Sequence, residues 1–126
     1  MIQTLDQSNT MCYRTISIDK VRDINGAISA QVRVPADSIW FDGHFPGTAV
    51  LPGVAQLAIV VAVLEGVLGT RLRVTEVSRV RFKLAILPAQ TMEVRITPKE
   101  NDPETYGFRL LKGQELACSG FLKVAV

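Results

Sequence analysis

Residues 52–69, PGVAQLAIVVAVLEGVLG, decide the fold of this 126-residue chain. Pro52 suits the first turn of a helix, because its missing N–H would have no partner there and its φ is already helical. Gly69 suits a left-handed cap at the other end. The stretch predicts a helix from Pro52 to about Leu68 whose apolar residues leave no continuous polar face. A helix that is apolar all round must be covered all round.

The segments on both sides of this helix are typical of β-strands. Apolar and polar residues alternate over 13–23, and Asn25-Gly26 predicts a hairpin turn into a second strand. The further turns are predicted at Asn101-Asp102-Pro103 and at Gly113. The strands after the first are predicted over residues 27–34, 74–87, 92–98, 106–112 and 115–126.

These elements predict one α+β domain over residues 1–126, in which a curved antiparallel sheet wraps around one long central helix. A sheet of this kind leaves one side of an apolar helix open. Pairing with an identical subunit is the usual way to cover such a surface, so we expect at least a homodimer.

The composition excludes several classes of protein. A hydrophobic fraction of 48% with 21% charged residues is typical of a globular chain. The net charge of +2 is too small for a protein that binds nucleic acid, so an acidic partner would need a local basic patch. The longest apolar run, residues 57–64, is shorter than the roughly 20 residues of a membrane span.

The sequence also bears on the compartment of the protein, on its cysteines and on cofactors. The first residues lack the basic and apolar regions of a secretory signal, so we expect the chain to stay in the cytoplasm. Cys12 and Cys118 lie far apart and form no Cys-x-x-Cys pair, which predicts buried thiols in place of a disulfide framework or a zinc site. No metal or redox cofactor is implied.

The chain has one histidine, His44, in an irregular segment just before the helix. Gly43 and Pro46-Gly47 mark this segment as a loop. A histidine in such a loop either hydrogen-bonds to neighbouring backbone or acts as a general base, since its ordinary pKa lies near 6.5. Its position alone favours the first interpretation, whereas the residues around it favour the second.

Residues 41–54, FDGHFPGTAVLPGV, resemble the signature of the β-hydroxyacyl-acyl-carrier-protein dehydratases, the FabZ and FabA family. Arg81-Phe82-Lys83 followed by Leu87-Pro88 is similar to the family's strand after the helix. The predicted order of strands and helix is that of the family's hotdog fold. The resemblance implies that His44 removes a proton from C2 of a 3-hydroxyacyl thioester. A carboxylic acid on the partner subunit's helix would protonate the departing C3 hydroxyl, giving water and a trans-2-enoyl thioester.

The start of the helix fits this chemistry. A helix N-terminus presents unpaired N–H groups and a partial positive charge, so we expect the amide of Gly53 to polarise the thioester carbonyl. A glycine there also lets the substrate approach the backbone closely. The same Pro-Gly pairs would suit any tight loop that leads into a helix. The residues expected to line the substrate are Phe45, Pro46, Gly47, Val54, Gln56 and Ala58.

The sequence departs from the family at the helix acid. The family's pattern puts that acid six residues after Pro52, where this chain has Ala58, and the family's glutamine corresponds to Ala62. Glu65 lies roughly 10 Å further along the helix and is expected to be solvated. Without an acid at Ala58, the sequence leaves open which group protonates the leaving hydroxyl.

Three alternatives remain for the missing acid. Asp42 would orient His44, lie near the leaving hydroxyl or stabilise the loop. Gln56 would hydrogen-bond the substrate without donating a proton as an acid does. His44 alone would return the C2 proton to the leaving oxygen. The LPGVAQ helix start is similar to the ApeI-like sub-branch of aryl polyene pathways.

A row of basic residues follows the helix. Arg79, Arg81 and Lys83 alternate with apolar residues and so share one face of the predicted strand. Such a row is either a solvated sheet face or, with Arg71 and Arg73, a patch that docks an acidic acyl carrier protein.

The predicted function is a hydro-lyase that acts on carrier-bound 3-hydroxyacyl thioesters in fatty acid or polyene-type lipid synthesis. One alternative is a hotdog thioesterase, although Ala58 also removes the helix carboxylate that such enzymes use. Another is a non-catalytic acyl-thioester-binding subunit whose partner in a heterodimer supplies the acid. Assembly of dimers into a trimer of dimers is left open.

Overall fold

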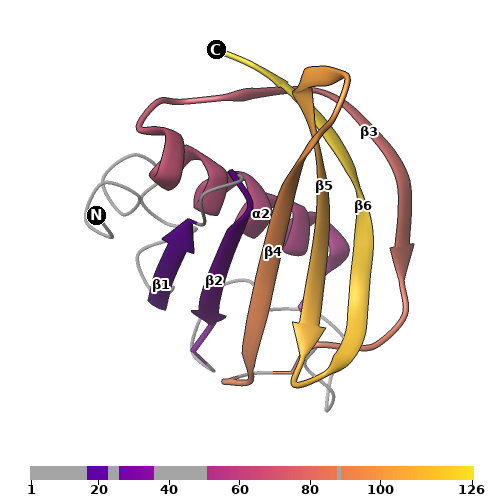
Figure 1. Ribbon diagram of the computed structural model, residues 1–126. Helices are drawn as coiled ribbons and strands as arrows, with labels where there is room; N and C mark the ends of the chain where they lie inside the picture. Colours follow the sequence, from indigo (N-terminus) through magenta and orange to yellow (C-terminus); the bar gives the residue numbers. More distant parts are fainter. Residues whose placement is uncertain (1–16, 23–25, 36–50, 88) are drawn as a thin grey trace.

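The computed structural model describes residues 17–22, 26–35, 51–87 and 89–126. Within these residues the chain folds into one long helix and a sheet (Figure 1). The elements are, in chain order, β1 (Ser17–Arg22), β2 (Ile28–Arg33), α2 (Gly53–Leu68), β3 (Arg73–Phe82), β4 (Thr91–Lys99), β5 (Asp102–Lys112) and β6 (Glu115–Ala125).

The described strands form one antiparallel sheet in the order β1-β2-β4-β5-β6-β3. The sheet curves around α2, which lies along its concave side (Figure 1). Although β3 directly follows the helix in sequence, it crosses to the far edge and pairs with the C-terminal strand β6. The predicted architecture, a curved antiparallel sheet around one helix, is therefore confirmed.

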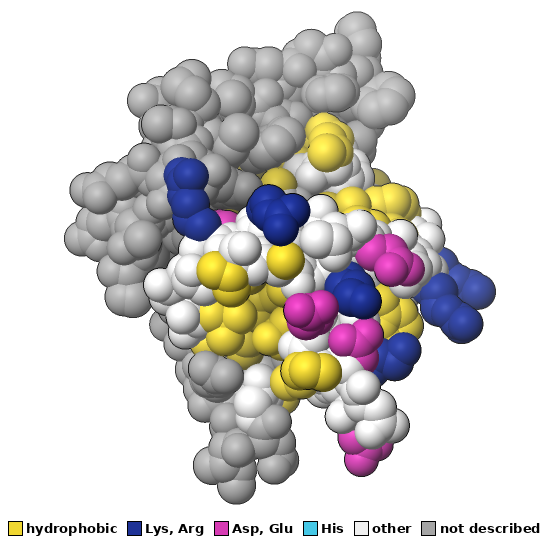
Figure 2. Space-filling view, turned by 90° about the horizontal axis from the view of Figure 1, so that it is seen from above, with side chains coloured by type: hydrophobic (Ala, Val, Ile, Leu, Met, Phe, Trp, Pro, Cys, Tyr) yellow, Lys and Arg dark blue, Asp and Glu magenta, His cyan; other side chains and the backbone are white. Residues whose placement is uncertain are grey.

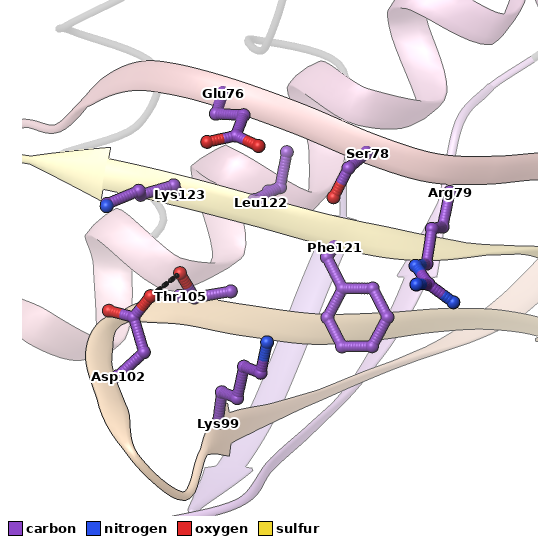
Figure 3. Close-up of a pocket in the computed structure, with 9 residues that line it drawn as sticks. All are labelled: Glu76, Ser78, Arg79, Lys99, Asp102, Thr105, Phe121, Leu122 and Lys123. Carbon is purple, nitrogen blue, oxygen red and sulfur yellow. Dashed lines mark hydrogen bonds between the residues drawn. The ribbon is translucent and has the colours of Figure 1, made fainter.

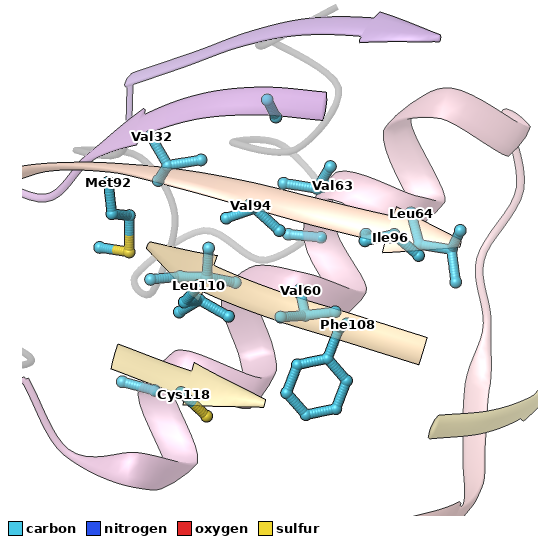
Figure 4. Close-up of a cluster of buried hydrophobic side chains, with 14 of the residues drawn as sticks. Val32, Val60, Val63, Leu64, Met92, Val94, Ile96, Phe108, Leu110 and Cys118 are labelled. Carbon is cyan, nitrogen blue, oxygen red and sulfur yellow. The ribbon is translucent and has the colours of Figure 1, made fainter. Parts of the chain in front are cut away.

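The core lies between α2 and the concave face of the sheet (Figure 4). In β4 the buried residues are Met92, Val94 and Ile96, and the residues between them point outward. Phe108 on β5 is the largest fully buried side chain of the described residues and packs in the same layer. This alternation of period two is what places apolar side chains against the helix and polar ones on the convex face.

The helix ends where the sequence predicts and begins one residue later than expected, at Gly53. Pro52 is the cap residue before Gly53, and Gly69 has a left-handed φ of 73°. The N–H of Gly69 donates to the carbonyl of Glu65 at 2.8 Å, which closes the last turn. No helix within the described ranges is long and apolar enough to cross a membrane.

As the sequence predicts, the described sheet leaves one side of the helix open in the single chain. The sheet reaches only one side of α2, so Val54 is 67% exposed. On the same side Leu57, Ala58 and Val61 are only half-buried. The covered side consists of Ala55, Gln56, Ile59, Val60, Ala62, Val63 and Leu64.

Two predicted boundaries in the sheet are wrong. β3 ends at Phe82 and does not continue to Leu87, because the N–H groups of Lys83 and Leu84 both donate to the carbonyl of Ala117 and the strand pairing stops there. The predicted turn at residues 101–103 is shorter than expected, since β5 already begins at Asp102. The turn at Gly113, with a φ of 63°, is confirmed.

Replacing Gly69 with alanine is expected to destabilise the protein by about 1 kcal/mol, because an L side chain is strained at positive φ. A Cβ at this position would have no heavy atom within 4 Å, so the cost would be conformational and not steric. Chemical denaturation of Gly69→Ala and Gly69→Asn tests this. Asparagine tolerates the left-handed region better than alanine, so Gly69→Asn should lose less stability. Equal losses in the two variants would contradict the role of Gly69 as a left-handed cap.

Candidate active site

The N-terminus of α2 is the centre of the candidate site. The carbonyl of Pro52 accepts hydrogen bonds from the N–H groups of Ala55 and Gln56 at 3.0 and 3.1 Å. The N–H groups of Gly53 and Val54 precede these and have no carbonyl to bond within the helix. The first turn carries no acidic residue. This helix end therefore keeps its partial positive charge for a negatively polarised ligand atom.

The last residue of β3 lies against the first residue of the helix. A Cβ built on Gly53 would approach Cζ of Phe82 to 2.7 Å, so the ring rests directly on the glycine. Phe82 is 52% exposed and forms one wall beside the helix end. The sequence predicts the need for glycine at this position but not this neighbour, because the contact joins residues almost thirty positions apart in the chain.

Gln56 is the one buried polar side chain that the described helix turns inward, with 4% of its surface exposed. Its Nε2 donates to the carbonyl of Leu51 at 3.2 Å. Because that carbonyl can only accept, the bond fixes which end of the amide is oxygen. Oε1 is buried and has no hydrogen-bond partner among the described residues. This oxygen can accept a hydrogen bond from a hydroxyl of a ligand, and an unsatisfied buried acceptor favours such binding.

No carboxylate of the helix stands near its N-terminus. Ala58 is half-buried and packs against the core, and Ala62 is fully buried. Oε2 of Glu65 accepts a hydrogen bond from the N–H of Leu72 at 2.8 Å. Glu65 is therefore half-buried and holds the segment after the helix, which corrects the expectation that it is merely solvated.

Several predicted site residues lie outside the described residues. They are Asp42, His44, Phe45, Pro46 and Gly47, together with Cys12. The structure brings together Gly53, Val54, Gln56 and Ala58 at the start of α2. The roles assigned to the first group stay predictions. The described ranges contain no group of three or more His, Cys, Asp and Glu side chains that could hold a metal ion.

Cys118 is a free, buried thiol on β6, as the sequence predicts. Burial raises the pKa of this thiol from 9.0 to about 11. At pH 8 the group is therefore protonated and unreactive, since the thiolate is the nucleophile. Native protein treated with iodoacetamide at pH 8 should leave Cys118 unmodified, while unfolded protein should be alkylated there. Peptide mass spectrometry checks this, and rapid modification of the native thiol would contradict it.

The predicted basic row is interrupted by a β-bulge. Arg79 has a positive φ of 54°, and the register of β3 against β6 shifts between Ser78 and Arg81. Arg81 pairs with Ser119, and Arg79 lines a hollow with Arg95 and Arg109, so both lie on the convex face. Lys83 lies beyond the end of the strand. Seen from above, basic and acidic side chains lie among exposed hydrophobic ones, so this end of the molecule has no patch of a single charge sign (Figure 2).

A curved antiparallel sheet around one long helix is the arrangement of the hotdog proteins, and comparisons with known proteins narrow this class. The profile of ApeI-like dehydratases matches residues 20–121. The chain belongs to the ApeI-like dehydratase family. It is 31% identical to the 3-hydroxyacyl-[acyl-carrier-protein] dehydratase FabZ of Moorella thermoacetica, over 90% of this chain and 87% of that relative. The predicted resemblance is confirmed.

Solved structures agree with this placement. The chain is similar to the dehydratase heterocomplex ApeI:P from Xenorhabdus doucetiae, with a TM-score of 0.75 and 25% identity over 86% of this chain and 95% of that one. A hypothetical thioesterase from Streptococcus pneumoniae, solved with coenzyme A, has a TM-score of 0.69 at 12% identity over 98% and 94%. The second likeness shows the shared fold alone.

Proposed function

We propose that this protein dehydrates 3-hydroxyacyl thioesters, carried on acyl carrier protein, to trans-2-enoyl thioesters in fatty acid or polyene-type lipid synthesis. The observation that carries the proposal is the start of α2. There an N-terminus without an acidic residue lies beside a buried amide oxygen that accepts no hydrogen bond from the described residues. The first feature suits a thioester oxygen that gains negative charge, and the second suits a substrate hydroxyl. Membership of the ApeI-like dehydratase family supports the same reaction.

In the proposed reaction His44 removes the C2 proton as general base. The N–H of Gly53 donates to the thioester oxygen and stabilises the negative charge that moves onto it. The electron pair of the C2–H bond then forms the C2–C3 double bond, and the C3–O bond breaks. Water leaves once the departing oxygen has gained a proton.

Gln56 has a separate role in this proposal. Its Oε1 accepts a hydrogen bond from the C3 hydroxyl. This bond turns a lone pair of the hydroxyl oxygen toward the proton held by His44. Because Ala58 has no proton to give, His44 returns the proton that it took from C2. Phe45, Pro46, Gly47, Val54 and Ala58 complete the substrate contacts.

Carrier docking is proposed at the exposed cations around β3, which are Arg71, Arg73, Arg79, Arg81 and Lys83. An acyl carrier protein is strongly acidic, and opposite charge speeds association. This set lies on or next to the strand whose last residue, Phe82, contacts Gly53. A carrier that docks there would deliver its acyl group close to the start of the helix.

We propose further that two chains assemble through the β3 edge. Among the described strands β3 pairs with β6 alone, and the apolar side chains of Val74, Val77 and Phe82 are each more than 40% exposed. Val54 adds to this surface from the helix. Pairing with a second subunit would bury apolar surface that costs free energy in water.

A second candidate function is that of the non-catalytic subunit in a heterodimeric dehydratase. Ala58 favours it, because a partner subunit would then supply the acid. The similar ApeI:P structure is a dehydratase heterocomplex. In this case the chain alone would be inactive, and it would gain turnover when mixed with a neighbouring homologue.

The experiment is a dehydration assay with a purified 3-hydroxyacyl carrier, read by mass spectrometry as the loss of one water from the acyl group. We expect enoyl product from the chain alone. Product only in the mixture with a homologue would favour the second candidate. No product in either case, while a FabZ control turns over, would refute the proposal. Release of free carrier thiol would indicate a thioesterase instead.

Replacing Gln56 with methionine, which has a similar length and no hydrogen-bonding amide, is expected to lower kcat/KM about tenfold. The reason is the loss of a hydrogen bond to the substrate hydroxyl, worth about 1 to 1.5 kcal/mol. Steady-state kinetics check this, with Gln56→Glu as a matched control that keeps an acceptor. An unchanged kcat/KM in Gln56→Met would remove Gln56 from the mechanism.

A further inference from the structure

The convex face of the sheet, which points away from α2, carries an unusual row of arginines. The pairing register places Arg95 opposite Arg109, Arg109 opposite Ser119, and Ser119 opposite Arg81. Adjacent strands lie about 4.8 Å apart, so the row crosses four strands and roughly 14 Å. Like charges directly opposite each other destabilise a sheet. The row is therefore a costly arrangement in a chain with a net charge of only +2.

Among the described residues, Arg95 is the one arginine of the row that a carboxylate neutralises. Nε and Nη2 of Arg95 donate to the two oxygens of Glu93 at 2.8 and 3.4 Å, and the hydroxyl of Ser29 donates to the same carboxylate. The hydrogen bond from Arg95, above all, lowers the pKa of Glu93. Within the described ranges, no carboxylate forms an ion pair with Arg79, Arg81 or Arg109. The row keeps an excess of positive charge.

The bulge in β3 adds a fourth arginine to this face. Between Ser78, which pairs with Phe121, and Arg81, which pairs with Ser119, β3 has one residue more than β6. Arg79 adopts a φ of 54° there, a conformation that costs free energy in any residue but glycine. Bulges re-aim side chains, and this one turns Arg79 toward both hollows of the convex face.

The first hollow has a volume of about 280 Å³. It exists because Gly107, between Thr97 and Phe121 in the register, has no side chain. A Cβ on Gly107 would lie 3.3 Å from Cε1 of Phe121, so the ring lies over the glycine. The side chains that line the hollow include Arg79, Arg95, Arg109, Thr97, Ser119 and Phe121.

The second hollow, of about 370 Å³, lies on the other side of Phe121 and is different in character (Figure 3). Arg79, Lys99 and Lys123 line it together with the carboxylates of Glu76 and Asp102, which offset most of the positive charge there. Nζ of Lys99 lies 5.7 Å from the centre of the Phe121 ring. Oδ2 of Asp102 already accepts a hydrogen bond from the hydroxyl of Thr105 at 2.7 Å. The lining of the first hollow contains no carboxylate, so an anion binds more favourably there than in the second hollow.

We propose that the hollow between Arg79, Arg95 and Arg109 binds the phosphate group of a soluble small molecule. The planar forks of guanidinium groups match phosphate oxygens and bind them through paired, charge-assisted hydrogen bonds. The hydroxyls of Ser119 and Thr97 supply further donors. The face of Phe121 packs against the rest of the ligand. This site lies on the opposite side of the sheet from α2, and the proposal does not rest on the proposed dehydratase activity.

The test is calorimetric titration of the wild-type chain with inorganic phosphate at constant ionic strength, without acyl substrate. We expect saturable binding, weakened at least tenfold in Arg109→Gln and in Arg79→Gly. Arg73→Gln removes the same charge at the other end of β3 and should bind as the wild type does. No saturable binding by the wild type, or an equal loss in Arg73→Gln, would overturn the proposal.

Arg79→Gly also separates binding from folding. Glycine accepts a positive φ without strain, so this variant should melt at the same temperature as the wild type or higher while it loses phosphate affinity. A lower melting temperature with unchanged affinity would mean that Arg79 is structural and would contradict its role.

A sedimentation assay distinguishes a soluble ligand from a membrane surface. Vesicles of phosphatidylcholine with and without phosphatidic acid are mixed with the wild type and with Arg109→Gln. We expect the protein to stay in solution with both kinds of vesicle. Sedimentation that needs both phosphatidic acid and Arg109 would assign the phosphate to a lipid headgroup and would contradict the proposal of a soluble ligand.

Discussion

Replacing His44 with alanine is expected to lower kcat/KM for dehydration by about 10² to 10⁴-fold, the range that a positioned general base contributes. In the proposed mechanism His44 both takes the C2 proton and returns it to the leaving oxygen, so its loss removes two steps. Because Ala58 offers no acid, no side chain of the helix would take over the proton transfer. The measurement is steady-state kinetics with a 3-hydroxyacyl carrier.

The matched control for this prediction is His44→Gln, which keeps a hydrogen-bonding side chain of similar reach but cannot act as a base at neutral pH. If the histidine only hydrogen-bonded the loop backbone, glutamine would restore much of the activity. Equal losses in both variants, with melting temperatures close to that of the wild type, are expected. Substantial turnover by either variant would show that another group removes the proton.

Replacing Phe108 with alanine is expected to destabilise the fold by about 3 to 5 kcal/mol, because it leaves a cavity in the layer between β5 and α2. Phe108 is 1% exposed and is the largest fully buried side chain of the described residues. A domain of this size has a total stability of about 5 to 15 kcal/mol, so the variant should lie near the limit of folding. Urea denaturation followed by circular dichroism measures the change.

Phe82→Ala also removes a phenylalanine ring, but at a position that is 52% exposed, so it should cost much less stability than Phe108→Ala. Because the Phe82 ring lies on Gly53, this variant should instead change the KM for the acyl substrate. A loss of stability equal to that of Phe108→Ala would contradict the assignment of the core to the concave face.

Most of the fold could be predicted from local patterns. The two ends of the helix, at Pro52 and Gly69, follow from the backbone preferences of single residues. The strands follow from the alternation of apolar and polar residues with a period of two. The crossing of β3 to the far edge of the sheet could not be read from such patterns, because it depends on pairing with β6 more than thirty residues later. The bulge at Arg79 could not be predicted either, because a bulge is defined by the pairing of β3 with its partner strand.

The candidate site could be predicted in part. Gly53, Gln56 and Ala58 come from one contiguous stretch, so the sequence places them together without further information. The contact of Phe82 with Gly53 depends on long-range packing. The unpartnered Oε1 of Gln56 and the hydrogen bond from the N–H of Leu72 to Glu65 depend on side-chain orientations that the sequence pattern does not give. The sequence predicts a basic row along β3 alone, whereas the pairing register places Arg81, Arg109 and Arg95 in a row that crosses four strands.

The most direct test of the central claim is hydrogen exchange at C2 of the substrate in D₂O. The wild-type chain is incubated with a 3-hydroxyacyl carrier, and both the enoyl product and the recovered substrate are examined by mass spectrometry. Reversible dehydration by His44 predicts enoyl product and deuterium at C2 of the recovered substrate, with neither in His44→Ala. Undeuterated substrate without enoyl product from the wild type, or undiminished exchange in His44→Ala, would contradict the proposed mechanism.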